Sequence, residues 1–149
     1  MAANAAIYLP VDQIDPTHVF DKVTLIPAEN AQTAHSYQID LSKVGSGQTI
    51  IQLNVMEKSV MTPHLTSFVN YVAGLDEPEE RRLTAAKVIG QTRMVVGLVT
   101  AQDFQDDPEI WHALFRLAGH YRGFVFVHDS LVMANGMPLV GPLVEKMAQ

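Results

Sequence analysis

The sequence predicts an α+β domain: a single mixed β-sheet with an N-terminal β-hairpin, a βαβ unit and a C-terminal β-hairpin, on which two to three helices pack. Two observations carry most of this prediction. Two apolar runs of strand length, Arg93–Thr100 and Phe124–Val127, enclose an amphipathic helical stretch, which is the pattern of a βαβ unit with parallel strands. Earlier in the chain, apolar and polar residues alternate weakly over Thr33–Leu41, and Gln48–Met56 is rich in β-branched residues. Glycines lie between these two segments, so together they predict a hairpin.

Length and composition indicate one folded domain covering residues 1–149. A chain of 149 residues has a common single-domain size and can bury a substantial core. Hydrophobic residues make up 48% and charged residues 17%, which is a globular composition. No internal repeat or low-complexity stretch divides the sequence.

The N-terminal third predicts mainly strands. Asn4–Leu9 (NAAIYL) is a short apolar run followed by proline, which favours a buried strand. Val11–Glu29 has an irregular pattern, and Asp15–Pro16 within it is a signal for a turn or a helix start. The predicted hairpin follows.

Two helices are expected next. Thr62 can cap the first, with Pro63 at its first position and Gly74 at its end. Asp76 can cap the second, with Glu79 three residues on in a pattern like a capping box. The expected buried side of the second helix consists of Leu83, Ala86 and Ile89, and Gly90 ends it.

The C-terminal part predicts a third helix, from Glu109 to Arg122, and a last hairpin. The hairpin spans Leu131–Leu139 and contains Asn135–Gly136, a strong turn signal; Pro142–Gln149 is expected to be a short helix or a frayed end. The residues of the third helix expected to be buried are Trp111, Leu114, Phe115 and Leu117. On this basis Phe115→Ala should cost on the order of 3–5 kcal/mol.

Charge and composition exclude several classes of function. Ten Lys and Arg stand against sixteen Asp and Glu, giving a formal charge of −6, which disfavours nucleic-acid binding. No run of 18 apolar residues exists, so we expect no membrane span. The first residues, Met1 to Asn4, show no basic run before an apolar stretch, so we expect no signal peptide. The absence of cysteine agrees with a reducing compartment, and the expected location is the cytoplasm.

No motif in the sequence indicates a cofactor, a metal or a catalytic residue. GxGxxG, GxxxxGK[ST], HExxH, GxSxG and an EF-hand loop are all missing. No two of the six histidines stand at i and i+4 on a predicted helix. His112, Arg116 and His120 are interpreted as a solvated stripe. His64, near a helix start, is interpreted as a neutral imidazole or a surface residue rather than a ligand.

Polar residues at the ends of the two predicted parallel strands form a candidate pocket. Ligands of open α/β sheets tend to bind outside the carboxyl ends of parallel strands. Thr100 ends one strand, and Asp103 follows soon after it. If His128 lies near these carboxylates, it could act as a general base. For Asp129 and Ser130, which follow the other strand, a turn into the last hairpin is the alternative explanation. The residues after the other strand are His128, Asp129 and Ser130.

Acidic residues at the starts of two helices form a candidate partner surface. Helix capping and the helix dipole explain most of these carboxylates, yet Glu80 and Asp103 are not needed for either. The full set consists of Glu77, Glu79, Glu80, Asp103, Asp106 and Asp107.

Three functions agree with these observations. The first is a non-catalytic domain that binds a basic protein partner through the acidic residues, such as a bacterial toxin-neutralising immunity protein or an adaptor. The second is a small enzyme with a strand-end site around His128, Asp129 and Asp103. The third is a subunit whose exposed apolar residues form a homo-oligomer interface. The first is the function we expect from the small size, the acidic balance and the missing catalytic motifs.

Overall fold

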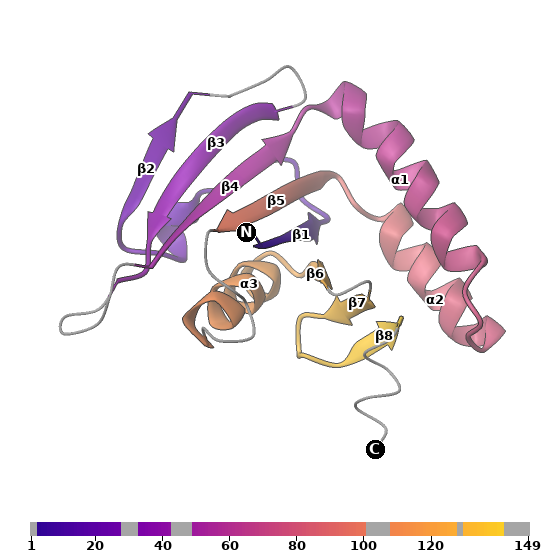
Figure 1. Ribbon diagram of the computed structural model, residues 1–149. Coiled ribbons are helices and arrows are strands. Elements are labelled where there is room, and N and C mark those ends of the chain that lie inside the picture. The colour runs from indigo at the N-terminus through magenta and orange to yellow at the C-terminus, as the bar shows by residue number, and fades with distance from the viewer. Residues whose placement is uncertain (1–2, 28–32, 43–48, 101–107, 128–129, 142–149) are drawn as a thin grey trace.

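Over the residues that it describes, the computed structural model contains one eight-stranded antiparallel sheet and three α-helices (Figure 1). It describes residues 3–27, 33–42, 49–100, 108–127 and 130–141. The strand order is β2-β3-β4-β5-β1-β6-β7-β8. The elements are β1 (Ala3–Leu9), the 3-10 helix η1 (Pro16–His18), β2 (Val23–Ile26), β3 (Thr33–Asp40), β4 (Ile50–Met56), α1 (Lys58–Ala73), α2 (Glu79–Gly90), β5 (Met94–Thr100), α3 (Pro108–His120), β6 (Phe124–Val127), β7 (Ser130–Met133) and β8 (Pro138–Val140). The predicted α+β class, with one sheet and packed helices, is confirmed.

The N-terminal strand β1 lies in the middle of the sheet. It pairs with β5 along its whole length, from Ala3 opposite Thr100 to Leu9 opposite Met94. On its other side it pairs with β6, where Tyr8 stands opposite Phe124. Because both neighbours run antiparallel to β1, β5 and β6 run in the same direction, as the predicted βαβ unit requires. They are separated by β1, however, so the paired strands of the sheet are antiparallel rather than mixed.

Both predicted hairpins are present. β3 pairs with β4, and β7 pairs with β8. In the last hairpin Gly136 has φ +89°, a conformation that favours glycine, and its N–H donates to the Met133 carbonyl at 2.8 Å. Strand β2 was not predicted, because four residues are too few to show an alternation. It pairs with β3 and forms one edge of the sheet.

Two predicted helix starts were wrong. Helix α1 begins at Lys58, four residues before the predicted cap at Thr62, so Pro63 lies inside the helix. Helix α2 begins at Glu79 after Pro78, and no side chain caps its first turn. Capping signals in the sequence therefore marked plausible but unused starts at both places.

The buried side of α2 also differs from the prediction. Ala85 and Ile89, four residues apart, are fully buried, whereas Leu83 is 63% exposed. The helix packs on α1 and reaches β8, and this orientation turns Leu83 toward solvent. None of the helices within the described ranges is both long and apolar enough to cross a membrane.

Helices cover both faces of the sheet, and each face has its own core. On one face, Ile7 of β1 packs in a core with Leu114 and Leu117 of α3. On the other face, Tyr8 of β1 packs in a core with Phe68 of α1. Figure 1 shows α1 and α2 side by side, apart from α3. Successive residues of a strand point to opposite faces, so β1 contributes to both cores.

The prediction for the buried residues of α3 was half right. Leu114 and Leu117 are fully buried, as expected. Trp111 and Phe115 are half-buried at the margin of the core, where their rings stack with centroids 5.9 Å apart. A half-buried ring leaves a smaller cavity when it is removed, so Phe115→Ala should cost less than the range expected for a core phenylalanine.

Gly123, between α3 and β6, allows β6 to approach β1. A Cβ at this position would lie 2.1 Å from the Tyr8 carbonyl oxygen and 2.7 Å from Cδ2 of Leu9. We therefore expect Gly123→Ala to lower the free energy of unfolding by about 1–3 kcal/mol or more. The matched control is Gly119→Ala in α3, where a Cβ meets nothing within 4 Å and which should gain up to about 1 kcal/mol. Urea denaturation of both variants measures the two effects, and equal effects would contradict this account of Gly123.

Candidate functional site

A groove of about 800 Å³ lies between helix α1 and the central strands β5, β1 and β6. The helix contributes His64, Ser67, Phe68 and Tyr71 to its lining. The strands contribute Ala6, Tyr8, Gly97, Val99 and Phe126, with Ala5, Leu98 and Val127 beside them. Small-molecule and side-chain binding sites in proteins commonly have volumes of about 300–1,000 Å³ and mostly apolar linings, so this groove has the size and character of a binding site.

The groove is hollow because two neighbouring positions of the sheet carry almost no side chain. Ala6 of β1 stands directly opposite Gly97 of β5, and directly opposed residues point to the same face. On the other side of Ala6 stands Phe126 of β6. The floor of the groove is therefore a methyl group and a glycine, next to an aromatic ring.

One face of α1 forms the opposite wall. His64, Ser67, Phe68 and Tyr71 stand at i, i+3, i+4 and i+7, which is the spacing of neighbours on one helical face. Phe68 is buried and anchors the helix to the sheet. His64 is half-buried, whereas Ser67 and Tyr71 are exposed. The buried part of this wall is therefore apolar, and its exposed part carries polar groups.

A hydrogen bond between Tyr8 and His64 joins the sheet to α1 beside the groove. The Tyr8 hydroxyl lies 2.7 Å from Nε2 of His64, and the two rings stack with centroids 5.8 Å apart. Tyr8 is 2% exposed and also stacks on Phe124, with centroids 4.8 Å apart, and contacts Phe68 at 5.0 Å. The pair is thus the polar part of an otherwise aromatic cluster.

Burial keeps both members of this pair uncharged near neutral pH. It raises the pKa of the Tyr8 hydroxyl well above its usual range, and it lowers the pKa of the His64 imidazole below its ordinary value. In each case the charged form loses more hydration than the neutral form. A neutral phenol and a neutral imidazole can share one hydrogen bond in either histidine tautomer, so the pair is suited to holding α1 on the sheet.

The mouth of the groove exposes apolar surface, and its described lining carries no formal charge. Tyr71 is 41% exposed and Val99 is 38% exposed. Phe126 meets Phe68 edge to face at 4.9 Å and Tyr71 edge to face at 6.0 Å. No Asp, Glu, Lys or Arg of the described chain lines the groove. Exposed aromatic side chains around an uncharged hollow are typical of contact surfaces.

Neither of the two described residues of the predicted strand-end pocket lines this groove. Thr100 is buried and its hydroxyl donates to the Ile50 carbonyl at 3.2 Å. Ser130 is fully buried. The register brings Thr100 of β5 and Ser130 of β7 to the same end of the strands, with β1 and β6 between them. His128 and Asp129 lie outside the described residues, so their proposed role stays a prediction.

Three of the six residues of the predicted acidic surface lie among the described residues. Glu79 and Glu80 are exposed in the first turn of α2, but Glu77 accepts a hydrogen bond from the Gly141 N–H at 3.1 Å, which ties the loop before α2 to the end of β8. In Figure 1 the starts of α2 and α3 lie on opposite sides of the molecule. The other three acidic residues, Asp103, Asp106 and Asp107, lie outside the described residues, and the surface stays a prediction.

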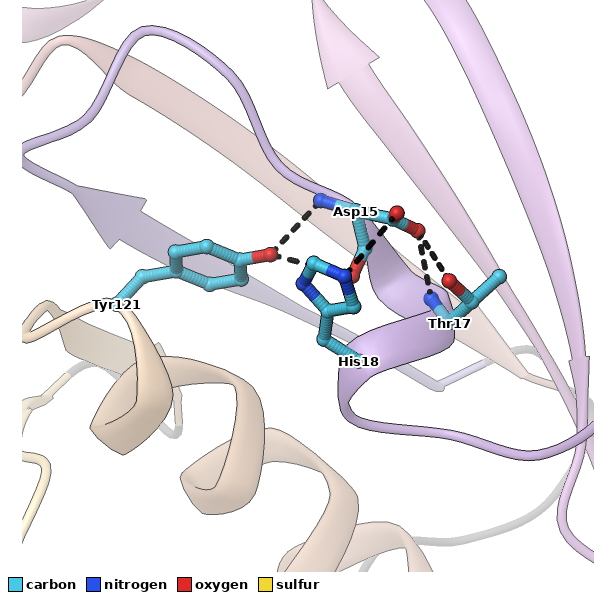
Figure 2. Close-up of polar contacts among 4 residues, drawn as sticks. All are labelled: Asp15, Thr17, His18 and Tyr121. Atoms are coloured by element: carbon cyan, nitrogen blue, oxygen red, sulfur yellow. Dashed lines mark hydrogen bonds and ion pairs between the residues drawn. The ribbon is translucent and has the colours of Figure 1, made fainter.

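A second polar cluster joins the loop after β1 to the end of α3 (Figure 2). The Asp15 N–H donates to the Tyr121 hydroxyl at 2.7 Å, and that hydroxyl donates to the Asp15 carbonyl at 3.2 Å. Hydrogen bonds from the Thr17 side chain and backbone hold the pKa of the Asp15 carboxyl below its ordinary value. His18 lies 3.5 Å from the same carboxylate. These contacts cap η1 and dock it on α3, so they are explained by the fold.

Of the solvated stripe predicted on α3, the two histidines are exposed, whereas the arginine also serves the fold. His112 and His120 are exposed, as predicted. Arg116 donates a hydrogen bond to the Val19 carbonyl and lies over the Phe20 ring, 5.5 Å from its centroid. In the described part of the chain no group of three or more His, Cys, Asp or Glu side chains could hold a metal ion.

Comparisons of this chain with protein-family models, curated proteins and solved structures found no match.

Sequence reasoning missed the residues that form the groove. Tyr8 was assigned only to a buried strand, and His64 was interpreted as a neutral imidazole or a surface residue. Neither interpretation indicates their contact, because the two residues are 56 positions apart in the sequence. One signal was available. His64, Ser67 and Tyr71 form a polar and aromatic stripe beside the apolar stripe of the same helix, and a stripe of this kind indicates a helix face that is neither core nor fully solvated.

The burial of His64 predicts a pH dependence of stability. Because its pKa is lower in the folded protein than in the unfolded chain, the unfolded chain binds the proton more readily below the ordinary histidine pKa of about 6.5. This contribution to stability is therefore complete above that pH and is lost as the pH falls through the folded pKa. The free energy of unfolding should fall less between about pH 7 and pH 5 in His64→Gln than in the wild type.

Urea denaturation across this pH range measures the effect. The same two proteins at about pH 8, where His64 is neutral in both states, provide the baseline. Parallel pH profiles for the two proteins would contradict the assignment.

Proposed function

We propose that this chain is a non-catalytic protein-binding domain, and that the groove beside α1 receives apolar side chains of a partner protein. The observation that carries the proposal is the groove itself: an uncharged, aromatic-lined hollow over Ala6 and Gly97. Protein interfaces concentrate their binding energy in a few anchor residues that fill such pockets. Tyr71 and Val99, exposed at the mouth, provide surface that a partner would bury.

The charge of the chain supports a basic partner. The formal charge is −6, and a field of this sign would speed the encounter with a positively charged protein more than it would tighten the final complex. Glu79 and Glu80, exposed at the start of α2, belong to the surface proposed for this steering, together with Glu77, Asp103, Asp106 and Asp107. A toxin-neutralising or adaptor role in the cytoplasm is the form of this function that we propose.

The chemistry of the Tyr8–His64 pair favours binding over catalysis at the groove. A phenol whose pKa is raised by burial is a poor base and a poor nucleophile, because both roles need the phenolate. The hydroxyl is also engaged with His64. The pair therefore supports a role in fixing the shape of the groove.

The test fills the groove and leaves the rest of the surface intact. A Cβ at Gly97 would meet nothing closer than the Asn54 carbonyl oxygen at 3.9 Å, so Gly97→Val should fold while its methyl groups occupy the floor. After capture and identification of a partner from the native host, its affinity should fall at least about tenfold for Gly97→Val, which corresponds to about 1.4 kcal/mol. The matched control is Leu83→Ser, which removes an exposed apolar side chain on α2 outside the groove and should leave the affinity unchanged.

Two further measurements separate the parts of the proposal. The association rate should fall with added salt, because exposed charges are screened beyond about 8 Å at physiological ionic strength. Charge reversal at Glu79 and Glu80 should lower the same rate.

An unchanged affinity for Gly97→Val would rule out the groove as the interface, and an acidic partner would rule out the steering. Catalytic turnover that is lost in a His128→Ala and Asp129→Ala double variant would instead favour the strand-end enzyme.

A further inference from the structure

We infer that the anchor received by the groove is the side chain of a tryptophan or a tyrosine: an uncharged planar ring with a hydrogen-bonding edge. This inference rests on the proposed function and specifies the chemistry of the same site. It follows from the different character of the two walls of the groove.

The wall formed by the sheet is flat and apolar. Ala6 and Gly97 stand opposite each other on neighbouring strands, with at most one methyl group projecting from the pair. Neighbouring strands lie about 4.8 Å apart, so the area over this pair is wide enough for a ring that lies parallel to the sheet. A branched aliphatic side chain could touch such a floor only at a few atoms, whereas a planar ring contacts it with a whole face.

Phe126 provides an aromatic neighbour for that ring. It stands opposite Ala6 on β6, one strand spacing from the floor, and aromatic pairs are favourable at centroid distances of about 4.5–7 Å. Phe126 already meets Phe68 and Tyr71 edge to face, so these three rings form an aromatic corner. A ring over Ala6 and Gly97 would extend this arrangement.

The wall formed by α1 is polar but uncharged. His64, Ser67 and Tyr71 line it, and each carries a group that can exchange a hydrogen bond. Nε2 of His64 is engaged by Tyr8, which leaves Nδ1 as the other hydrogen-bonding atom of that ring. An indole N–H or a phenol O–H at the edge of the bound ring could exchange a hydrogen bond with His64 or Ser67 of this wall, whereas a purely apolar ring would cover these polar groups without offering them a partner.

The same walls discriminate against charged side chains. The described lining contains no Asp, Glu, Lys or Arg, and burial holds His64 in its neutral form near pH 7. A lysine or glutamate side chain entering the groove would lose hydration and find no opposite charge on its described lining, which is unfavourable. The basic residues expected of the partner therefore belong beside its anchor and not in the groove.

The experiment titrates the full-length protein with side-chain analogues and follows the Gly97 amide by NMR. The probes are 3-methylindole for tryptophan, p-cresol for tyrosine, toluene for phenylalanine and n-butylamine for lysine. We expect 3-methylindole and p-cresol to bind at least about fivefold more tightly than toluene, and n-butylamine to cause no saturable shift. Gly97→Val should abolish binding of the first two probes, whereas Leu83→Ser should bind them like the wild type.

The outcomes distinguish this inference from the proposed function. Equal affinities for toluene and p-cresol, or saturable binding of n-butylamine, would overturn the inference even if Gly97→Val weakens the partner. Selective binding of the indole and the phenol at Gly97 would support it. An identified partner whose affinity is unaffected by Gly97→Val would overturn the proposed function, whatever the probes show.

Discussion

The pairing of β1 on both of its edges is the interaction on which the rest of the structure depends. Seven residue pairs join it to β5, and three join it to β6. Without β1 the sheet would separate into a four-stranded half, β2 to β5, and a three-stranded half, β6 to β8. The strand also supplies both cores, because Ile7 and Leu9 face α3 while Tyr8 faces α1. A segment at one end of the sequence therefore joins two halves that follow it.

The groove is a consequence of this central position. Tyr8 and Ala6 project from β1 toward α1, one to the aromatic cluster and one to the floor. The chain leaving β1 is held in turn by Asp15, whose backbone is bound by the Tyr121 hydroxyl at the end of α3. The elements on the two faces of the sheet are thus linked through β1 and the loop that follows it. This arrangement fixes the Tyr8 ring between Phe124 and α1 and keeps the floor beside it free of side chains.

Local patterns in the sequence predicted the elements that local interactions determine. The two hairpins and the common direction of β5 and β6 followed from short-range alternation, from a glycine turn and from an amphipathic helix between apolar runs. Long-range pairing left no such pattern. Nothing in Ala3–Leu9 indicates that it inserts between strands about 90 and 120 residues later. Likewise, Tyr8 and His64 meet through tertiary packing alone, and Pro63 resembled a helix start although α1 begins at Lys58.

The separation of the two faces has a spectroscopic consequence. The single tryptophan of the sequence, Trp111, stacks on Phe115 at the margin of the α3 core, across the sheet from the groove. Its emission should respond when α3 leaves the sheet and its indole becomes hydrated, but not when a molecule enters the groove on the other face. Tyr8 and Tyr71, in contrast, line the groove itself. Trp111 emission from the unlabelled protein therefore reports on the integrity of the fold independently of the occupancy of the groove.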